Sequence, residues 1–127
     1  MLNGIHHIAL KTDHEKQFRE VLHFYREVLG CAPVRAWGEG EDSCAMLDLG
    51  NTLLEVSIRG AAGQGGDRFA HIAFRTDDVD GAVDLVRAAG CPITVEPKNA
   101  NLGGDYPIRV AFCIGPAGEE VEFFQEC

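Results

Sequence analysis

Apolar residues recur at spacings of three and four in two stretches of the chain, which predicts an amphipathic helix in each. A glycine follows each stretch, Gly30 and Gly90, and glycine takes the left-handed conformation at a helix end at little cost. The pattern therefore predicts one helix in each half of the chain. The apolar positions of the first are Phe18, Val21, Leu22, Tyr25, Val28 and Leu29, and those of the second are Val79, Ala82, Val83 and Val86.

A short motif before the first helix returns before the second. His7-Ile8-Ala9-Leu10 recurs 64 residues later as His71-Ile72-Ala73-Phe74. After each helix come three segments with the composition of strands. These strands are expected at 34–37, 44–49 and 53–58 in the first half and at 93–96, 108–114 and 120–125 in the second. Each half is therefore predicted to run strand, helix, strand, strand, strand.

The repeat also predicts the domain organisation. We expect a single α+β domain over residues 1–127, with βαβββ modules at about 1–59 and 67–127, because neither module can bury its sheet alone. The glycine-rich segment 60–66 is expected to join the modules. Together they would form a curved mixed sheet with helices on its outer face and a cavity on the other. Segment 99–107 is expected to be a loop over that cavity.

Composition narrows the classes of function. The 127 residues include 11 Lys and Arg against 20 Asp and Glu, a net charge of −9, which disfavours nucleic acid and anionic membrane surfaces as partners. No stretch has the length of a membrane span or the features of a signal peptide. The five cysteines are scattered without a Cys-x-x-Cys pair, which is typical of free thiols in a reducing compartment. We expect a cytoplasmic protein that acts on a small molecule.

Strand alternation places four polar side chains opposite the apolar ones. His7 and Glu55 in the first half, and His71 and Glu122 in the second, lie on the faces that point away from the predicted helices. Two imidazoles and two carboxylates suit Ni, Co, Mn, Fe or Zn. Each residue alone is explained as well by a buried histidine or a solvated carboxylate, but their agreement with the repeat predicts a metal site. His6 is expected to point toward the helices, and a register slip of one residue would exchange it with His7.

These features resemble the vicinal oxygen chelate superfamily, which includes glyoxalase I, methylmalonyl-CoA epimerase, extradiol dioxygenases, and fosfomycin and bleomycin resistance proteins. The resemblance covers essentially the whole chain. It rests on the two His-Ile-Ala motifs, on Phe24-Tyr25 with Leu29-Gly30, and on the ending Gly118-Glu119-Glu120-Val121-Glu122-Phe123. The family's four metal positions fall on His7, Glu55, His71 and Glu122.

The second of these positions separates the members of the superfamily. Glutamate there, as at Glu55, resembles bacterial glyoxalase I, whereas the epimerase usually has glutamine. Extradiol dioxygenases use two histidines and one glutamate and have no ligand at that position. Antibiotic-binding members of the bleomycin type lack the metal ligands. The resemblance therefore implies a metal-dependent, glyoxalase I-like lyase or isomerase, built as a homodimer with one divalent ion per site.

The resemblance also implies roles for single residues. The substrate would be a 2-oxoaldehyde–thiol hemithioacetal or a related α-hydroxycarbonyl compound, with Glu122 as the leading base and Glu55 as the second. Lys11 and Arg59 stand where glutathione-using members commonly have Arg and Asn, so the identity of the thiol stays open. Arg75 has the place in the second half that Lys11 has in the first. All three are candidate substrate contacts, with ordinary surface cations as the alternative.

Three other functions are compatible with the same sequence. The chain could be a metal-free protein that sequesters a small molecule or antibiotic, which the intact set of four ligands disfavours. It could be an acyl-CoA epimerase, which uses the same kind of proton abstraction. It could also be a non-haem iron dioxygenase.

Overall fold

The computed structural model describes residues 1–59, 68–115 and 118–127. Its contacts divide the chain into two compact units. The N-terminal unit comprises His7–Ala70, and the C-terminal unit comprises Met1–His6 together with His71–Cys127. Strands β1 (Leu2–Lys11) and β5 (Phe69–Thr76) each contribute residues to both units. The predicted connector at 60–66 lies outside the described residues.

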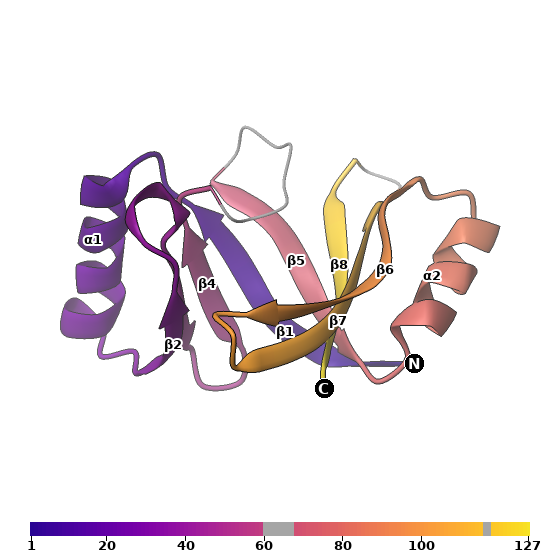
Figure 1. Cartoon of the computed structure of the whole chain (residues 1–127), viewed down its shortest axis with the longest axis horizontal. Helices are drawn as coiled ribbons and strands as arrows, with labels where there is room; N and C mark the ends of the chain where they lie inside the picture. The colour runs from indigo at the N-terminus through magenta and orange to yellow at the C-terminus, as the bar shows by residue number, and fades with distance from the viewer. Residues whose placement is uncertain (60–67, 116–117) are drawn as a thin grey trace. The chain divides into compact units, whose positions relative to one another are not determined.

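In the N-terminal unit, one helix and three strands follow the second part of β1 (Figure 1). Helix α1 (Glu15–His23) continues directly into a π-helical segment, η1 (Phe24–Val28). The remaining elements are β2 (Pro33–Trp37), the 3-10 turn η2 (Gly40–Asp42), β3 (Cys44–Asp48) and β4 (Leu53–Ser57). The strands are ordered β2-β3-β4-β1. β1 runs parallel to β4, and the other neighbours are antiparallel.

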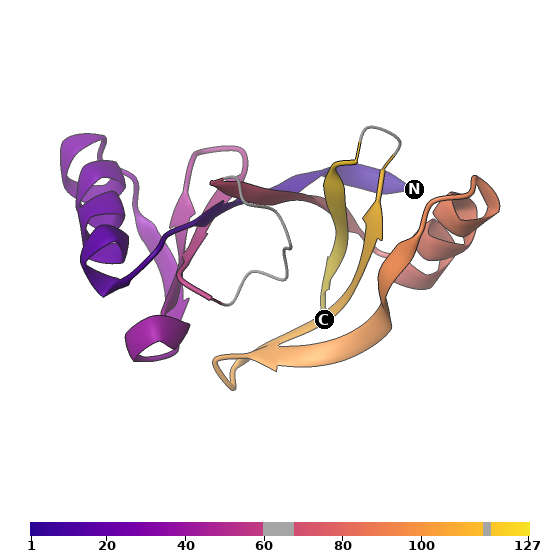
Figure 2. The same ribbon diagram turned by 90° about the horizontal axis from the view of Figure 1, so that it is seen from above.

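The C-terminal unit repeats this arrangement. After β5 come α2 (Val79–Ala88), β6 (Ile93–Leu102), β7 (Tyr106–Ile114) and β8 (Glu120–Glu126). The strands are ordered β5-β8-β7-β6, with β5 parallel to β8 and the other pairs antiparallel. Within this unit α2 lies beside β6 (Figure 2). Both units have the order β-α-β-β-β, so the expected α+β fold of two βαβββ modules is confirmed.

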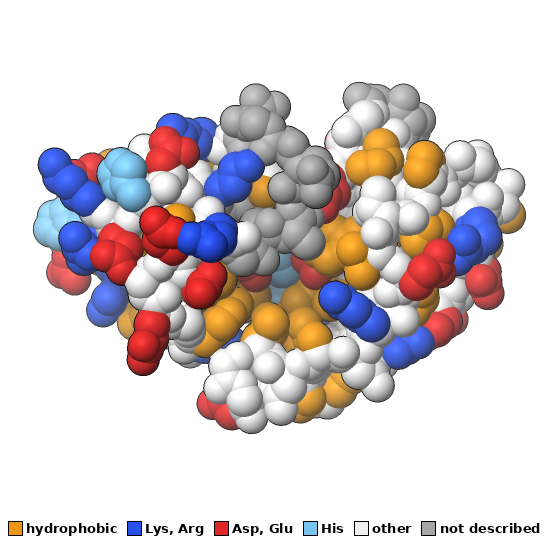
Figure 3. Space-filling view, turned by 45° about the horizontal axis from the view of Figure 1, so that its top comes forward, with side chains coloured by type: hydrophobic (Ala, Val, Ile, Leu, Met, Phe, Trp, Pro, Cys, Tyr) orange, Lys and Arg blue, Asp and Glu red, His pale blue; other side chains and the backbone are white. Residues whose placement is uncertain are grey.

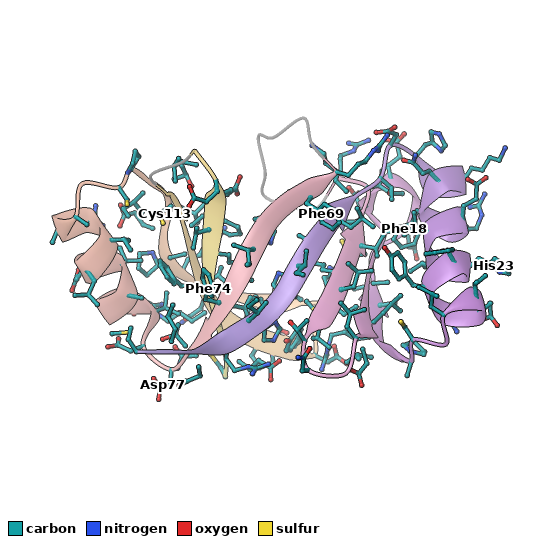
Figure 4. All side chains as sticks on the ribbon, turned by 180° about the vertical axis from the view of Figure 1, so that it is seen from behind. Phe18, His23, Phe69, Phe74, Asp77 and Cys113 are labelled. Carbon is teal, nitrogen blue, oxygen red and sulfur yellow. The ribbon has the colours of Figure 1, made fainter. Side chains whose placement is uncertain are left out.

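Helix α1 buries its apolar side against one face of the strands. Phe18 points from α1 toward the strands, whereas His23 points away from them (Figure 4). The face that Phe18 covers consists of Ala45, Leu47, Leu54, Val56 and Ile58, with Leu10, Val21, Leu22, Tyr25 and Cys31 at its margin. The alternate residues of β3 and β4 therefore point to the other face.

Two residues of the predicted apolar helix face do not join this core. Val28 and Leu29 are 62% and 58% exposed, so the prediction was wrong for them. The reason is the change of helix type at Phe24, because the π-helical segment bonds each residue to one five positions away. Apolar residues spaced by three and four no longer stay on one side of such a helix.

The core of the C-terminal unit is built in the same way. Helix α2 places Val79, Ala82 and Val83 against Ala111 and Cys113 of β7 and Phe123 of β8. Phe74 of β5 and Val121 of β8 pack at the margin of this cluster. Gly30 and Gly90, which follow the two helices, have φ angles of 77° and 91°, as predicted for left-handed helix ends. No helix in the described parts of the chain is long and apolar enough to cross a membrane.

Segment 99–107 is a β-hairpin, and its prediction as a loop was wrong. β6 continues to Leu102, β7 begins at Tyr106, and these two residues face each other in the antiparallel register. The turn between them uses Gly103 and Gly104, both with positive φ. Asn101 supports the turn because its side-chain oxygen accepts a hydrogen bond from the Tyr106 amide at 2.8 Å. The polar composition of this segment corresponds to a turn only at its centre. On either side, backbone pairing of β6 with β7 outweighs the low strand propensity of the residues.

The packing of α1 predicts a large and a small loss of stability for alanine substitutions at two phenylalanines that lie six residues apart. Phe18→Ala should lower the free energy of unfolding by about 3–5 kcal/mol, because it leaves a cavity in the core beneath α1. Phe24→Ala should change it by only about 0.5 kcal/mol, because Phe24 is 47% exposed and lies outside the core cluster beneath α1. Urea denaturation of the metal-free protein measures both values. Equal losses would contradict this packing.

Candidate metal centre

The N-terminal unit holds one His–Glu pair on the face opposite α1. His7 lies on β1 and Glu55 on β4, and Ala9 is the register partner of Glu55 in the parallel ladder between these strands. Both side chains are buried, at 0% and 8% residue exposure. The His7 Nε2 atom lies 3.7 Å from a carboxylate oxygen of Glu55. Leu54 and Val56, which flank Glu55, point to the core beneath α1.

The C-terminal unit holds a second pair at the equivalent place. His71 lies on β5, Glu122 lies on β8, and Ala73 is the register partner of Glu122. The His71 Nε2 atom lies 3.0 Å from Glu122 Oε1, and both residues are buried. The His71 ring packs edge-on against Phe112, with ring centroids 5.2 Å apart. Phe112 faces Glu122 in the ladder of β7 with β8, so one aromatic ring borders both members of the pair.

The two pairs share one geometric rule. In each unit the histidine stands two residues before the alanine that faces the glutamate in a parallel ladder. Two atoms that each lie about 2.1 Å from one ion are at most about 4.2 Å apart. Both nitrogen–oxygen distances, 3.7 Å and 3.0 Å, satisfy that limit. A buried carboxylate is costly unless it is paired or binds a metal, and the imidazole–carboxylate donors of each pair fit a divalent transition metal.

Two further polar side chains share the face of Glu55 in the N-terminal unit. Ser57, two residues along β4, is 1% exposed, and its hydroxyl has no hydrogen-bond partner among the described residues. Cys44 of β3 faces Ser57 in the antiparallel register. Burial, followed by the nearby Glu55 carboxylate, raises the pKa of the Cys44 thiol to about 12. Cys44 therefore stays protonated at neutral pH and is a poor nucleophile. The register of β3 against β4, which the sequence did not reveal, brings these two residues together.

Within its own unit His6 points away from α2, so the prediction that it faces the helices was wrong. It belongs to the C-terminal unit, where its ring stacks on Phe124 with centroids 4.1 Å apart. Phe124 alternates with Phe123, which packs under α2, and so shares the face of Glu122. The physical reason is that β1 passes from one unit to the other between His6 and His7. Alternation counted in the N-terminal unit does not carry over that boundary.

The three candidate substrate contacts have different surroundings. Lys11 is half-buried on β1 and faces Ser57 in the register with β4. Arg59 is exposed and forms an ion pair with Glu41. Arg75 is exposed on β5, beside a hollow of about 220 Å³. That hollow is lined by Asn3, Arg75, Thr76, Asp77, Gln125 and Glu126.

The two histidines of the α1 region, His14 and His23, differ from the histidines of the buried pairs in exposure and in their partners. His14 caps the start of α1, where its Nδ1 accepts a hydrogen bond from the Gln17 amide at 3.1 Å. His23 is exposed on the outer side of the same helix. Histidine side chains lie among mixed acidic and basic ones on this surface of the N-terminal unit (Figure 3). Both are exposed, whereas His7 and His71 are buried and each lies beside a carboxylate.

Comparison with known proteins establishes the class. The profile of the Glyoxalase/Bleomycin resistance protein/Dioxygenase superfamily matches residues 4–123, and the chain belongs to this superfamily. None of the curated proteins compared with the chain matches it.

Solved structures agree with this fold. A methylmalonyl-CoA epimerase variant from Streptomyces coelicolor, in complex with 2-nitronate-propionyl-CoA, has a TM-score of 0.73 and 23% identity over 98% of each chain. A hypothetical protein from Bacillus halodurans has a TM-score of 0.74 and 20% identity, over 97% of this chain and 94% of its own. The methylmalonyl-CoA epimerase of Mycobacterium tuberculosis has a TM-score of 0.71 and 16% identity, over 99% and 89%. At these identities the likeness concerns the fold alone.

Proposed function

We propose that His7, Glu55, His71 and Glu122 together hold one divalent metal ion, and that the protein catalyses proton transfer on a small carbonyl compound. The observation that carries the proposal is the pair of buried His–Glu contacts, one in each unit and each at the same register offset. A binding protein without metal would have no need to bury two carboxylates beside two imidazoles. The ion could be Ni, Co, Zn, Mn or Fe, because the donor set favours no single one.

In the proposed reaction Glu122 is the group that moves a proton. A bound metal supplies Lewis acidity that makes the C–H next to a substrate carbonyl more acidic. Glu122 accepts that proton on a carboxylate oxygen and returns it to the neighbouring carbon. Glu55 is the second carboxylate able to do so. His7 and His71 hold fixed positions, and the edge of Phe112 against His71 limits the movement of that ring. Cys44 is excluded as a base because its raised pKa keeps it protonated.

The substrate favoured here is a 2-oxoaldehyde–thiol hemithioacetal or a related α-hydroxycarbonyl compound, which makes the protein a glyoxalase I-like lyase. Glutamate rather than glutamine at position 55 supports this choice, by the resemblance to bacterial glyoxalase I. Lys11, Arg59 and Arg75 are the proposed contacts for the anionic parts of the substrate. Arg59 would have to exchange its ion pair with Glu41 for such a contact.

Acyl-CoA epimerisation is the second candidate. It is favoured by the similarity of the fold to methylmalonyl-CoA epimerases over nearly the whole chain. The chemistry is closely related, since a proton is removed from the carbon next to a thioester and returned to it. The two candidates therefore differ in the substrate and not in the residues that move the proton.

One assay distinguishes the candidates. Ni-, Co- and Zn-loaded protein is incubated in D₂O, without O₂, with methylglyoxal adducts of several thiols and, separately, with methylmalonyl-CoA. We expect metal-dependent turnover of a thiol adduct, with deuterium in the product wherever the carboxylate exchanges its proton with solvent. Turnover of methylmalonyl-CoA alone would favour the epimerase. Turnover seen only with iron-loaded protein, in parallel reactions that contain O₂, would favour a dioxygenase. Tight ligand binding without turnover would favour a sequestering protein.

A further inference from the structure

A second cluster of polar side chains lies in the C-terminal unit, on the face of β8 that carries Glu122. His6 Nε2 lies 2.7 Å from Glu126 Oε1 and 3.1 Å from the Tyr106 hydroxyl. The Tyr106 hydroxyl donates a hydrogen bond to the same Glu126 oxygen at 2.5 Å. His6 and Tyr106 are 1% and 5% exposed, while the Glu126 side chain is 55% exposed. The three residues come from β1, β7 and β8, and His6 is 100 residues from Tyr106 and 120 from Glu126 in the chain.

The protonation states of this cluster follow from its hydrogen bonds. The Tyr106 O–H donates to Glu126 Oε1, and the His6 Nε2 donates to the same oxygen when it carries the ring proton. An ionised carboxylate is the stronger acceptor for both donors. Burial opposes ionisation, but the hydrogen bonds from His6 and Tyr106 outweigh it and lower the pKa of Glu126. The His6 ring also stacks on Phe124. A charged acceptor, a hydroxyl and an aromatic face thus hold one imidazole in a single orientation.

The side chains of the first part of β1 are mostly exposed, although β1 is a hydrogen-bonded neighbour of β5 in the sheet. Met1, Leu2 and Ile5 are 56%, 44% and 36% exposed, and His6 is the first buried residue of the chain. Gly4 has a φ of 104°, which departs from a regular strand. The Thr76 hydroxyl donates a hydrogen bond to the Met1 carbonyl at 3.1 Å. His6 is the buried anchor of this segment, and its side-chain hydrogen bonds add to the backbone pairing of β1 in holding it.

We propose that Tyr106 and Glu126 are positioning residues for the metal ligand His7, acting through His6. Fixing the His6 ring fixes the β1 backbone at the residue directly before His7, where the chain leaves the C-terminal unit. A metal ligand binds tightly only when its backbone and ring are held in advance. The inference rests on the proposed function, because it assumes that His7 binds a metal.

Tyr106→Phe tests the inference because it removes one hydroxyl and keeps the ring. Tyr25→Phe is the matched control, since Tyr25 is half-buried in η1 of the N-terminal unit and has no part in the cluster. Co²⁺ is titrated into metal-free wild-type protein and each variant, and the affinity, the visible Co²⁺ absorption and the urea midpoint are recorded. We expect Tyr106→Phe to weaken Co²⁺ binding on the order of tenfold, the lower end of the loss seen when a ligand-orienting group is removed.

The affinity and the spectrum separate positioning from mere stability. A variant that is only less stable but still folded would bind Co²⁺ with unchanged affinity and an unchanged spectrum. We expect Tyr106→Phe to shift the Co²⁺ absorption bands as well as the affinity. Tyr25→Phe should leave both the affinity and the absorption bands unchanged. If Tyr106→Phe did not fold, Glu126→Gln would replace it, because the amide oxygen still accepts from Tyr106 but the charge is lost. The same weakening is expected there.

The outcomes distinguish this inference from the proposed function. Wild-type protein that binds Co²⁺, with variants that bind it equally well, would overturn the positioning role alone. Wild-type protein that binds no Co²⁺ would overturn the metal centre and this inference with it. Weaker binding and a shifted spectrum in the Tyr106 variant, with an unaffected Tyr25 variant, would support both.

Discussion

His71→Ala is expected to weaken the binding of Ni²⁺, Co²⁺ or Zn²⁺ by more than about 100-fold. Loss of a group that only orients a metal ligand weakens binding by about 10- to 100-fold, and this variant removes a proposed ligand itself. His71 is buried and lies 3.0 Å from Glu122, so no exposed side chain can replace its nitrogen without rearrangement. Its loss leaves a buried carboxylate next to a small cavity. Isothermal titration of metal into the stripped protein measures the change, with atomic absorption to count bound ions.

The matched control for this experiment is His23→Ala. His23 is an exposed histidine in the last turn of α1, on the side that points away from the strands. The stoichiometry and the affinity should stay at the wild-type values in this variant. An equal loss in both variants would mean that metal binds to surface histidines, and the four-ligand centre would be wrong.

Glu122→Gln is expected to lower kcat by about 100-fold or more, the usual effect of losing a positioned general base. Glutamine keeps an oxygen that can bind a metal and nearly the same volume, but its amide cannot take up a proton. Metal affinity should therefore fall much less than kcat. Steady-state kinetics on the substrate found in the turnover assay give kcat, and titration of the same preparation gives the affinity.

Two comparisons make this result specific. Glu20→Gln changes an exposed carboxylate of α1 and should leave kcat unchanged. Glu55→Gln should reduce kcat less than Glu122→Gln if Glu122 is the main base. Near-normal turnover in Glu122→Gln would instead assign the proton transfer to Glu55 or to a solvent molecule.

Local patterns in the sequence are sufficient to predict the helices and strands of this fold. A helix repeats every 3.6 residues and a strand every two, so the apolar positions alone predicted both helices and the core faces of the strands. The repeated motif at His7 and His71 predicted that the two halves share one order of elements, which the structure confirms. The same alternation predicted the sides of Leu54, Val56 and Phe123, which all pack under helices.

The local patterns failed where the local geometry departs from the regular period. Val28 and Leu29 lie outside the core because a π-helical segment changes the angle between successive residues. Segment 99–107 has the composition of a loop, yet most of it pairs in the ladder of β6 with β7. In both cases the decisive interaction is a backbone hydrogen-bond pattern, which leaves no regular signature in side-chain type.

Periodicity acts between neighbours in the chain, so the order of elements, the core faces and the residue types available for a metal centre were predictable without a structure. Which strands lie side by side, when they are distant in the chain, became visible only in the folded protein. It places Ser57 opposite Cys44, and it joins His6 to Tyr106 and Glu126 over 100 and 120 residues. Strand pairing sets such contacts, and no local pattern encodes it. The same long-range pairing brings His71 to within 3.0 Å of Glu122.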